Sequence, residues 1–309
     1  MIKRTIEISS APTHVTSRLK QLVLERDGAT IGSIPCEDLG VVVVDHPQTT
    51  YTHAALASLV ESDAVMVICG RNHLPHGILL PLTDHSQVVW RIAEQVAISK
   101  PLQKRLWQQI VRAKVLAQAG NLPRDSAAYR KLAELARQVR SGDPTNIEAQ
   151  AARIYWSAWL DTPDDQPPPE FRDFAPAPFR RDPDGDGINS LLNYGYAILR
   201  AAVARVLVAS GLLPALGLHH SNRSNAFCLA DDLLEPLRPL VDERVRELKR
   251  AGGVELTPTT KSALLSLLTL TVRYDGQTGP LLVSLHRYVA SLVNCFQGTA
   301  ESLEIPTRC

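Results

Sequence analysis

The segment Ser86-Gln87-Val88-Val89-Trp90-Arg91-Ile92-Ala93-Glu94-Gln95-Val96 marks the point where the sequence changes character. Val88, Val89, Ile92 and Val96 recur at helical spacing, which predicts an amphipathic helix. Short β-like runs separated by turns precede this segment, and no convincing cluster of strands follows it. We therefore expect an α+β protein with a small β-rich domain at 1–85 and a larger all-α domain at 86–309.

The first 85 residues contain several segments with strand-like composition. Met1–Ile8 alternates apolar and polar residues, as a half-buried strand does. Turn residues such as Asp27-Gly28 and Gly70 separate the segments. The predicted strands are Arg18–Leu24, Thr30–Ile34, Gly40–Val44 and Ala64–Cys69, with a single helix at Gln48–Glu61.

Composition indicates an ordinary globular chain. Of 309 residues, 45% are hydrophobic and 21% charged, which excludes disordered and membrane-spanning classes. The apolar stretch Ala197–Leu218 contains Arg200 and Arg205, which are costly inside a bilayer, so we interpret it as a buried helix. The start lacks the apolar region of a secretory signal, and five scattered cysteines without a CxxC pair fit a reducing compartment. We expect a cytoplasmic protein with no membrane partner.

Positive charge is concentrated in one region, although the net charge is only +1. Lys100–Arg140 contains ten basic residues against only Asp125 and Glu134. Four of the basic side chains could share a helix surface and contact DNA phosphates: Lys104, Arg105, Arg112 and Lys114. A solvated helix face is the alternative interpretation.

A proline-rich segment interrupts the helical part. Thr162–Gly187 contains seven of the 21 prolines, which predicts a long loop. Its end, Asp182-Pro183-Asp184-Gly185-Asp186-Gly187, matches the opening of an EF-hand loop, but position 12 is Asn193 instead of a glutamate. We therefore favour a polar turn that leads into a helix at Asn189–Ala209 over a calcium site.

Two further segments carry potential metal ligands. In Gly217–Pro239, Asp232 and Glu235 are three residues apart and share one helix face, and an imidazole from the preceding loop could complete a divalent-metal site. In Asn146–Trp156, Glu148 lies at a helix start that Asp143 or Thr145 can cap. A structural histidine and a first-turn acid favoured by the helix dipole are the simpler readings of each segment taken alone.

Three ordered motifs together resemble one family. They are Asn146-Ile147-Glu148-Ala149-Gln150-Ala151-Ala152 with Tyr155-Trp156, Asn189 with Leu192-Asn193-Tyr194-Gly195-Tyr196-Ala197-Ile198-Leu199-Arg200, and His220 with Asp232-Leu233-Leu234-Glu235-Pro236-Leu237-Arg238-Pro239. The chain resembles the CRISPR-associated integrase of spacer acquisition, the first of the numbered Cas proteins, in its type II form. The resemblance covers essentially the whole chain.

The resemblance implies a metal site and the residues that form it. By motif position, Glu148, His220 and Glu235 would be the catalytic ligands of Mn²⁺ or Mg²⁺. Asp232 would be a supporting acid, and the adjacent His219 leaves the choice of histidine open. Arg238 would either orient Glu235 or bind phosphate, and Arg180 and Arg181 would be further DNA contacts.

The resemblance also implies an activity and partners. The family member would be an endonuclease and integrase of antiviral defence, inserting short double-stranded fragments into CRISPR repeat DNA by attack of a 3′-hydroxyl. It would form a homodimer, through the β-rich domain, and two dimers would be bridged by a dimer of the small ferredoxin-like second Cas protein in a heterohexamer. The alternative hypothesis is a catalytically silent DNA-binding scaffold.

Overall fold

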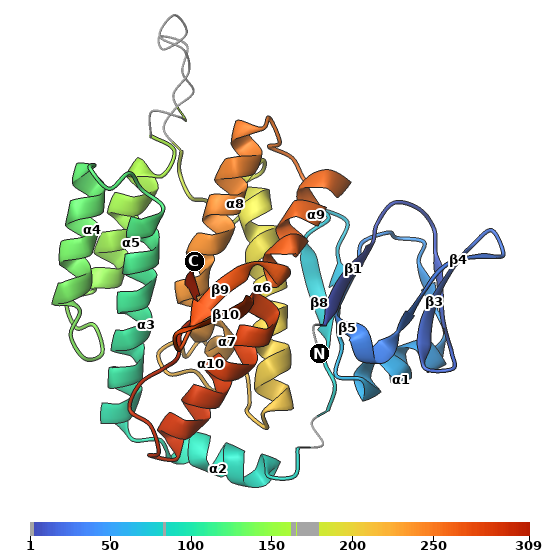
Figure 1. Cartoon of the computed structure of the whole chain (residues 1–309), viewed down its shortest axis with the longest axis horizontal. Helices are drawn as coiled ribbons and strands as arrows, with labels where there is room; N and C mark the ends of the chain where they lie inside the picture. Colours follow the sequence, from blue (N-terminus) through green and yellow to red (C-terminus); the bar gives the residue numbers. More distant parts are fainter. Residues whose placement is uncertain (1–2, 83–84, 162–164, 166–178) are drawn as a thin grey trace, which may run out of the picture.

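The computed structural model describes residues 3–82, 85–161, 165 and 179–309. A strand-rich N-terminal part lies beside a larger, mostly helical part (Figure 1). The first sheet has the order β1-β5-β7-β8. Strands β1, β5 and β7 are parallel and β8 is antiparallel. These strands are Arg4–Ile8, Leu39–Val44, Val65–Cys69 and Pro75–Leu79.

A second sheet has the order β4-β3-β2-β6. Its strands are Ala29–Pro35, Gln21–Arg26, His14–Arg18 and Thr50–Tyr51. The predicted single strand at Arg18–Leu24 is wrong, because Leu19 and Lys20 have positive φ and turn the chain between β2 and β3. The turn predicted at Asp27-Gly28 joins β3 to β4. Helix α1 is His53–Glu61, shorter than the predicted Gln48–Glu61, and Thr52 caps it.

Strand β5 separates two hydrophobic cores. Val42 and Val44 pack with the second sheet and α1, whereas Val41 and Val43 pack into the core of the helical part. Side chains of a strand alternate between the two faces of its sheet, so one run of valines serves both cores. Burial on both faces explains why this strand is continuously apolar.

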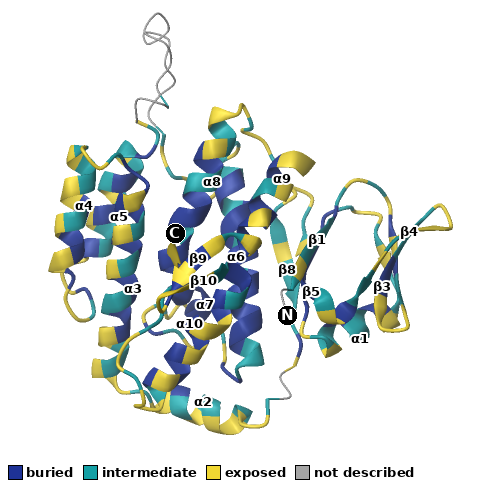
Figure 2. Cartoon of the chain, in the orientation of Figure 1, coloured by how far each residue is buried: buried dark blue, intermediate teal, exposed yellow. Residues whose placement is uncertain are grey.

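The helical part is arranged around α6 (Ile188–Ala209), which is buried along most of its length (Figure 2). By length and composition α6 could cross a membrane, but 78% of its apolar window is buried in the structure, so it is a core helix. The buried helix predicted at Ala197–Leu218 is correct only as far as Ala209, because turns follow that residue. The other helices are α2 (Val88–Ala97), α3 (Lys100–Gly120), α4 (Ala127–Gln138), α5 (Ile147–Ala158), α7 (Cys228–Leu234), α8 (Arg238–Arg250), α9 (Pro258–Leu265) and α10 (Leu281–Phe296). Short 3-10 helices are η1 (Cys36–Asp38), η4 (Glu235–Leu237) and η5 (Ser266–Thr269).

The predicted α+β fold, with a strand-rich part followed by a mostly helical part, is confirmed, but the helical part also contains strands. A three-stranded sheet of order β10-β9-β11 lies among the C-terminal helices, with strands Gln277–Pro280, Thr271–Tyr274 and Thr307–Arg308. Asp275 and Gly276 both have positive φ and form the tight turn between β9 and β10. Asp-Gly pairs favour such hairpin turns, so this pair was an available signal.

Polar contacts also join the two parts of the chain. Lys261 of α9 forms a buried ion pair with Asp45, which follows β5, and His73 contacts the same carboxylate at 3.0 Å. The guanidinium of Arg205 in α6 donates to the carbonyl of Asp63. The strand-rich part is therefore held to the helical part by buried charge as well as by the shared core.

We predict that Lys261→Met lowers the free energy of unfolding by about 3–5 kcal/mol, because it leaves Asp45 buried without its cation. Urea denaturation measures this change. Lys131→Met is the control, since Lys131 and Glu134 form an ion pair with both side chains about half exposed. Adding Asp45→Asn to Lys261→Met should recover part of the loss. Equal effects of the Lys261 and Lys131 substitutions would contradict the prediction.

Candidate active site

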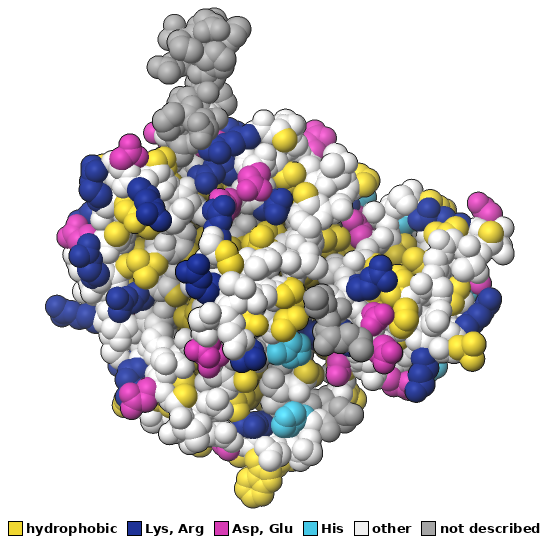
Figure 3. Space-filling model, in the orientation of Figure 1, with side chains coloured by type: hydrophobic (Ala, Val, Ile, Leu, Met, Phe, Trp, Pro, Cys, Tyr) yellow, Lys and Arg dark blue, Asp and Glu magenta, His cyan; other side chains and the backbone are white. Residues whose placement is uncertain are grey.

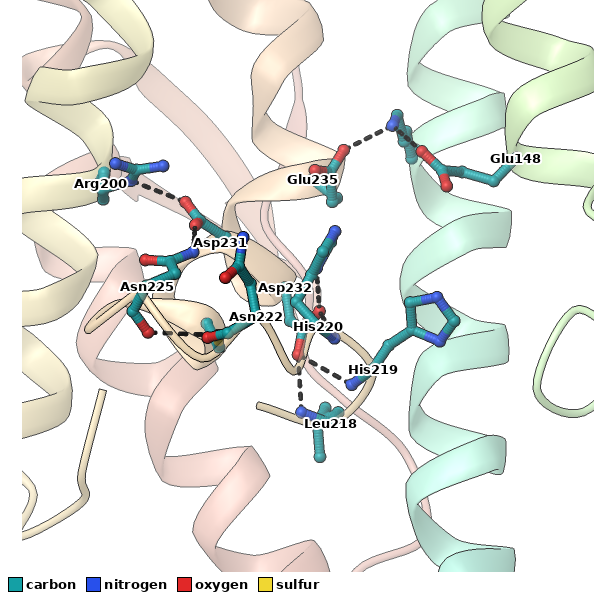
Figure 4. A network of polar contacts seen from close by, with 12 residues as sticks. Glu148, Arg200, Leu218, His219, His220, Asn222, Asn225, Asp231, Asp232 and Glu235 are labelled. Atoms are coloured by element: carbon teal, nitrogen blue, oxygen red, sulfur yellow. Dashed lines mark hydrogen bonds and ion pairs between the residues drawn. The ribbon is translucent and has the colours of Figure 1, made fainter. Parts of the chain in front are cut away.

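Glu148 lies in the first turn of α5, where the preceding loop fixes the backbone. Asn146 is the N-cap and accepts a hydrogen bond from Ala149 N at 3.3 Å. The Asp143 carboxylate accepts hydrogen bonds from the backbone N–H groups of Ile147 and Glu148 at 2.8 and 2.9 Å. Of the two predicted caps, Asp143 and Thr145, it is Asp143 that binds the N–H groups of this turn, in addition to the N-cap Asn146. The Glu148 side chain extends toward α3 (Figure 4).

Glu235 lies where α7 passes into the 3-10 helix η4. Pro236 and Pro239 fall in the first turns of η4 and α8, where the absent N–H costs little. The Glu235 side chain is buried, and its Oε1 lies 3.2 Å from Arg238 Nε. Burial alone would raise the pKa of Glu235, but Arg238 and Lys114 outweigh it and hold the pKa at about 2. Arg238 therefore forms an ion pair with Glu235, and its expected roles in orienting Glu235 or binding phosphate stay predictions.

Lys114 joins the two glutamates, which corrects its assignment to an exposed phosphate-binding surface. Its Nζ lies 2.5 Å from Glu148 Oε1 and 2.5 Å from Glu235 Oε2. The side chain is 10% exposed, because it faces inward from α3. Burial opposes the charged form of Lys114, but the two carboxylates raise its pKa above the ordinary value.

His220 is held by Asp232. The His220 Nδ1 lies 2.6 Å from Asp232 Oδ1. The same carboxylate accepts hydrogen bonds from the backbone N–H groups of Leu218, His219 and His220 at 2.6, 3.0 and 3.2 Å. This hydrogen bond to Asp232 raises the pKa of His220. Asp232 therefore fixes both the loop and the ring, and leaves Nε2 of His220 for another partner.

His219 occupies a different position. Its ring stacks on Trp107 of α3, with centroids 4.2 Å apart and an interplanar angle of 1°. Figure 4 shows the His220 ring below Glu235 and the His219 ring turned toward α3. Within the described residues, no group of three or more His, Cys, Asp or Glu side chains is close enough to hold a metal ion. The structure brings Glu148 and Glu235 together, with His220 adjacent.

Sequence reasoning missed several residues that shape this site. A Cβ on Gly217 would lie 2.4 Å from the carbonyl oxygen of His220 and 2.8 Å from Asp232 Oδ2, so only glycine fits. The glycine that begins the histidine segment was the available signal. The inward direction of Lys114 and the contact of Trp107 with His219 could not be predicted, because a helical pattern does not show which residues contact a neighbouring element.

A further buried acid, Asp242, lies near Arg238. Asp242 of α8 accepts hydrogen bonds from Tyr155 at 2.9 Å and from Tyr196. The guanidinium carbon of Arg238 lies 4.8 Å from the centroid of the Tyr196 ring. Burial raises the pKa of Asp242 to about 6, against the opposing effect of the two hydroxyls.

The other predicted DNA contacts lie outside this cluster. Lys104, Arg105 and Arg112 are exposed on α3, and basic side chains gather over α3–α5 (Figure 3). Arg180 is exposed, whereas Arg181 is half-buried and donates to Asn189 and Asn193. Residues 182–187 form a polar turn before α6, as predicted. Most of the predicted proline-rich loop lies outside the described residues.

We predict that the contribution of Asp242 to the free energy of unfolding falls as pH rises from about 4 to 6, because folded Asp242 retains a proton that the unfolded chain releases near 3.8. Asp242→Asn should reduce this slope. Urea denaturation at pH 4.5 and 6.5 measures the effect, with the exposed Glu134→Gln as control. Identical slopes in wild type and Asp242→Asn would contradict the assignment.

Comparisons with known proteins agree with the family suggested by the motifs. The family model described as CRISPR associated protein Cas1 matches residues 6–266. A curated relative from Neisseria meningitidis serogroup C, named CRISPR-associated endonuclease Cas1, is 37% identical over 93% of this chain and 90% of its own length.

Solved structures share the fold. A casposase bound to integration product has a TM-score of 0.78 at 19% identity, covering 98% of this chain and 93% of that one. A chain of a Cas6-RT-Cas1–Cas2 complex has a TM-score of 0.77 at 18% identity, covering 98% of this chain and 36% of that one. The match to the family model and the 37% identity to the curated relative show that the chain belongs to the Cas1 family of CRISPR-associated proteins.

Proposed function

We propose that this chain is a metal-dependent DNA integrase and endonuclease of CRISPR adaptation. The observation that carries the proposal is the convergence of Glu148 and Glu235 on one cation, the ammonium of Lys114, with His220 beside them. Curated relatives named endonucleases support the nuclease activity, and the casposase structure with its integration product supports strand transfer.

The donor atoms are of the kinds that bind a divalent metal ion, and two of the three expected ligands, Glu148 and Glu235, already converge on one cation. Two carboxylate oxygens already lie 2.5 Å from one positive nitrogen, near the roughly 2.1 Å of a Mg²⁺–oxygen bond. Glu235 Oε2 is buried and lies 2.5 Å from Lys114 Nζ, so a metal ion would take up this oxygen in place of the ammonium. His220 keeps Nε2 available because Asp232 binds Nδ1. Mixed oxygen and nitrogen ligands suit Mn²⁺, with Mg²⁺ as the alternative.

The proposed reaction is a transesterification. A 3′-hydroxyl of the incoming fragment attacks a phosphorus of the repeat, and one phosphodiester bond forms as another breaks, releasing a new 3′-hydroxyl. Such an exchange needs no external energy source. A metal ion held by Glu148, Glu235 and His220 would polarise the phosphate and stabilise charge on the oxygens. Within the chain, Arg238 keeps Glu235 ionised and Asp232 fixes His220.

The surface beside the site suits a DNA substrate. Lys104, Arg105 and Arg112 lie on the helix that also carries Lys114, so phosphates bound there would lead toward Glu148. We further propose a homodimer, and a heterohexamer of two such dimers bridged by a dimer of the small second Cas protein. The similarity to a chain of a Cas1–Cas2 complex supports such a partner.

We predict that Glu148→Gln and Glu235→Gln each abolish strand transfer, because each removes a charged ligand while keeping side-chain size. The assay joins a short duplex with free 3′-hydroxyls to a repeat-bearing plasmid, with Mn²⁺ or Mg²⁺ and the small partner protein. Glu134→Gln is the matched control, since its carboxylate is exposed on α4. Undiminished strand transfer by both site variants would overturn the proposal. A folded wild type that binds DNA without any metal-dependent product would favour the silent scaffold.

The two histidines should differ in their effect. We predict that His220→Ala reduces strand transfer far more than His219→Ala, because only the His220 ring contacts Asp232 and lies next to Glu235. Asp184→Ala, in the exposed turn before α6, should leave the metal response unchanged. A larger loss in His219→Ala than in His220→Ala would show that His219, and not His220, is the metal ligand.

A further inference from the structure

Lys114 occupies an unusual position for a lysine. It extends from α3 into the space between α5 and η4, and its ammonium contacts one oxygen of each glutamate. A buried lysine needs compensation for its lost hydration, and here both compensating groups are the carboxylates expected to bind metal. The same point therefore attracts two different cations.

We propose that Lys114 is a displaceable internal cation, whose ammonium holds Glu148 and Glu235 together without metal and must leave when a divalent ion binds. This inference rests on the proposed function. A metal ion bound to Glu148 Oε1 and Glu235 Oε2 would take the place of Nζ, because both oxygens lie 2.5 Å from that atom.

The chemistry of the two nearby cations supports different roles. Lysine has a compact charge on a flexible four-carbon stem and can move away from a site without unfolding its helix. Arg238 is packed over the Tyr196 ring and contacts the other oxygen of Glu235. Arg238 can thus stay as a fixed counter-ion while Lys114 exchanges with the metal.

The proposal has two consequences that can be measured separately. Without metal, removal of the ammonium leaves two carboxylates facing each other, which lowers thermal stability by mutual repulsion. With metal, the ion no longer competes with a resident positive charge, so its affinity rises. A lysine with a merely structural role would lower stability without strengthening metal binding.

The test compares full-length wild type, Lys114→Met and the surface control Lys131→Met. Isothermal titration calorimetry with MnCl₂ measures affinity, and thermal unfolding with and without Mn²⁺ measures stability. We expect Lys114→Met to have a lower Tm than the control without metal, a larger Mn²⁺-induced rise in Tm, and a Kd for Mn²⁺ about tenfold lower or more. If Lys114→Met does not fold without metal, Lys114→Gln keeps hydrogen-bonding capacity without the charge and is measured in the same way.

Two failures can be told apart. Mn²⁺ binding to wild type that is unchanged or weaker in the Lys114 variant would overturn the displacement proposal and leave the proposed function intact. Absence of Mn²⁺ binding in both wild type and Lys114→Met would overturn the metal site and the displacement proposal together.

Discussion

Two carboxylates brought to one point inside a protein repel each other unless nearby cations offset them, and this constraint organises the centre of the molecule. Glu148 and Glu235 come from segments far apart in the sequence, and both contact Lys114 from a third. Arg238 supplies a second positive charge to Glu235. The low pKa of Glu235, about 2, follows from these cations because burial acts in the opposite direction.

Contacts from the surrounding fold hold Glu148, Glu235 and His220 in position. Asp143 fixes the first turn of α5, and the change from α7 to a 3-10 helix sets the direction of Glu235. Asp232 accepts hydrogen bonds from the backbone N–H groups of residues 218–220 and contacts the His220 ring. One buried carboxylate therefore holds both the backbone at these residues and the ring. Gly217 allows that loop to pass close to Asp232.

Sequence patterns predicted the strand-rich and helical parts because their hydrophobic periods differ over long stretches. The valines of β5 were recognisable as a strand. That they pack alternately into two hydrophobic cores depends on tertiary contacts, which the sequence of one strand does not show. The strands β9–β11 were missed because they are short and lie between segments with helical spacing, so the Asp275-Gly276 turn was not recognised as part of a hairpin. Ordered motifs predicted Glu148, His220 and Glu235 as site residues, and the structure brings the two glutamates to one cation. The inward direction of Lys114 was not found, since the charge pattern along α3 places it with exposed neighbours.

The choice of basic side chains at the site has a physical reason. Arginine presents a planar group that can pack on an aromatic ring while contacting a carboxylate, and Arg238 does both with Tyr196 and Glu235. Tyr196 in turn donates to Asp242, a carboxyl group whose pKa burial raises to about 6. A guanidinium at position 114 would favour a paired contact with one carboxylate, whereas a single ammonium can lie between two. With an arginine at 238 and a lysine at 114, one counter-ion stays fixed beside Glu235, and the other can move away from the point where the two glutamates meet.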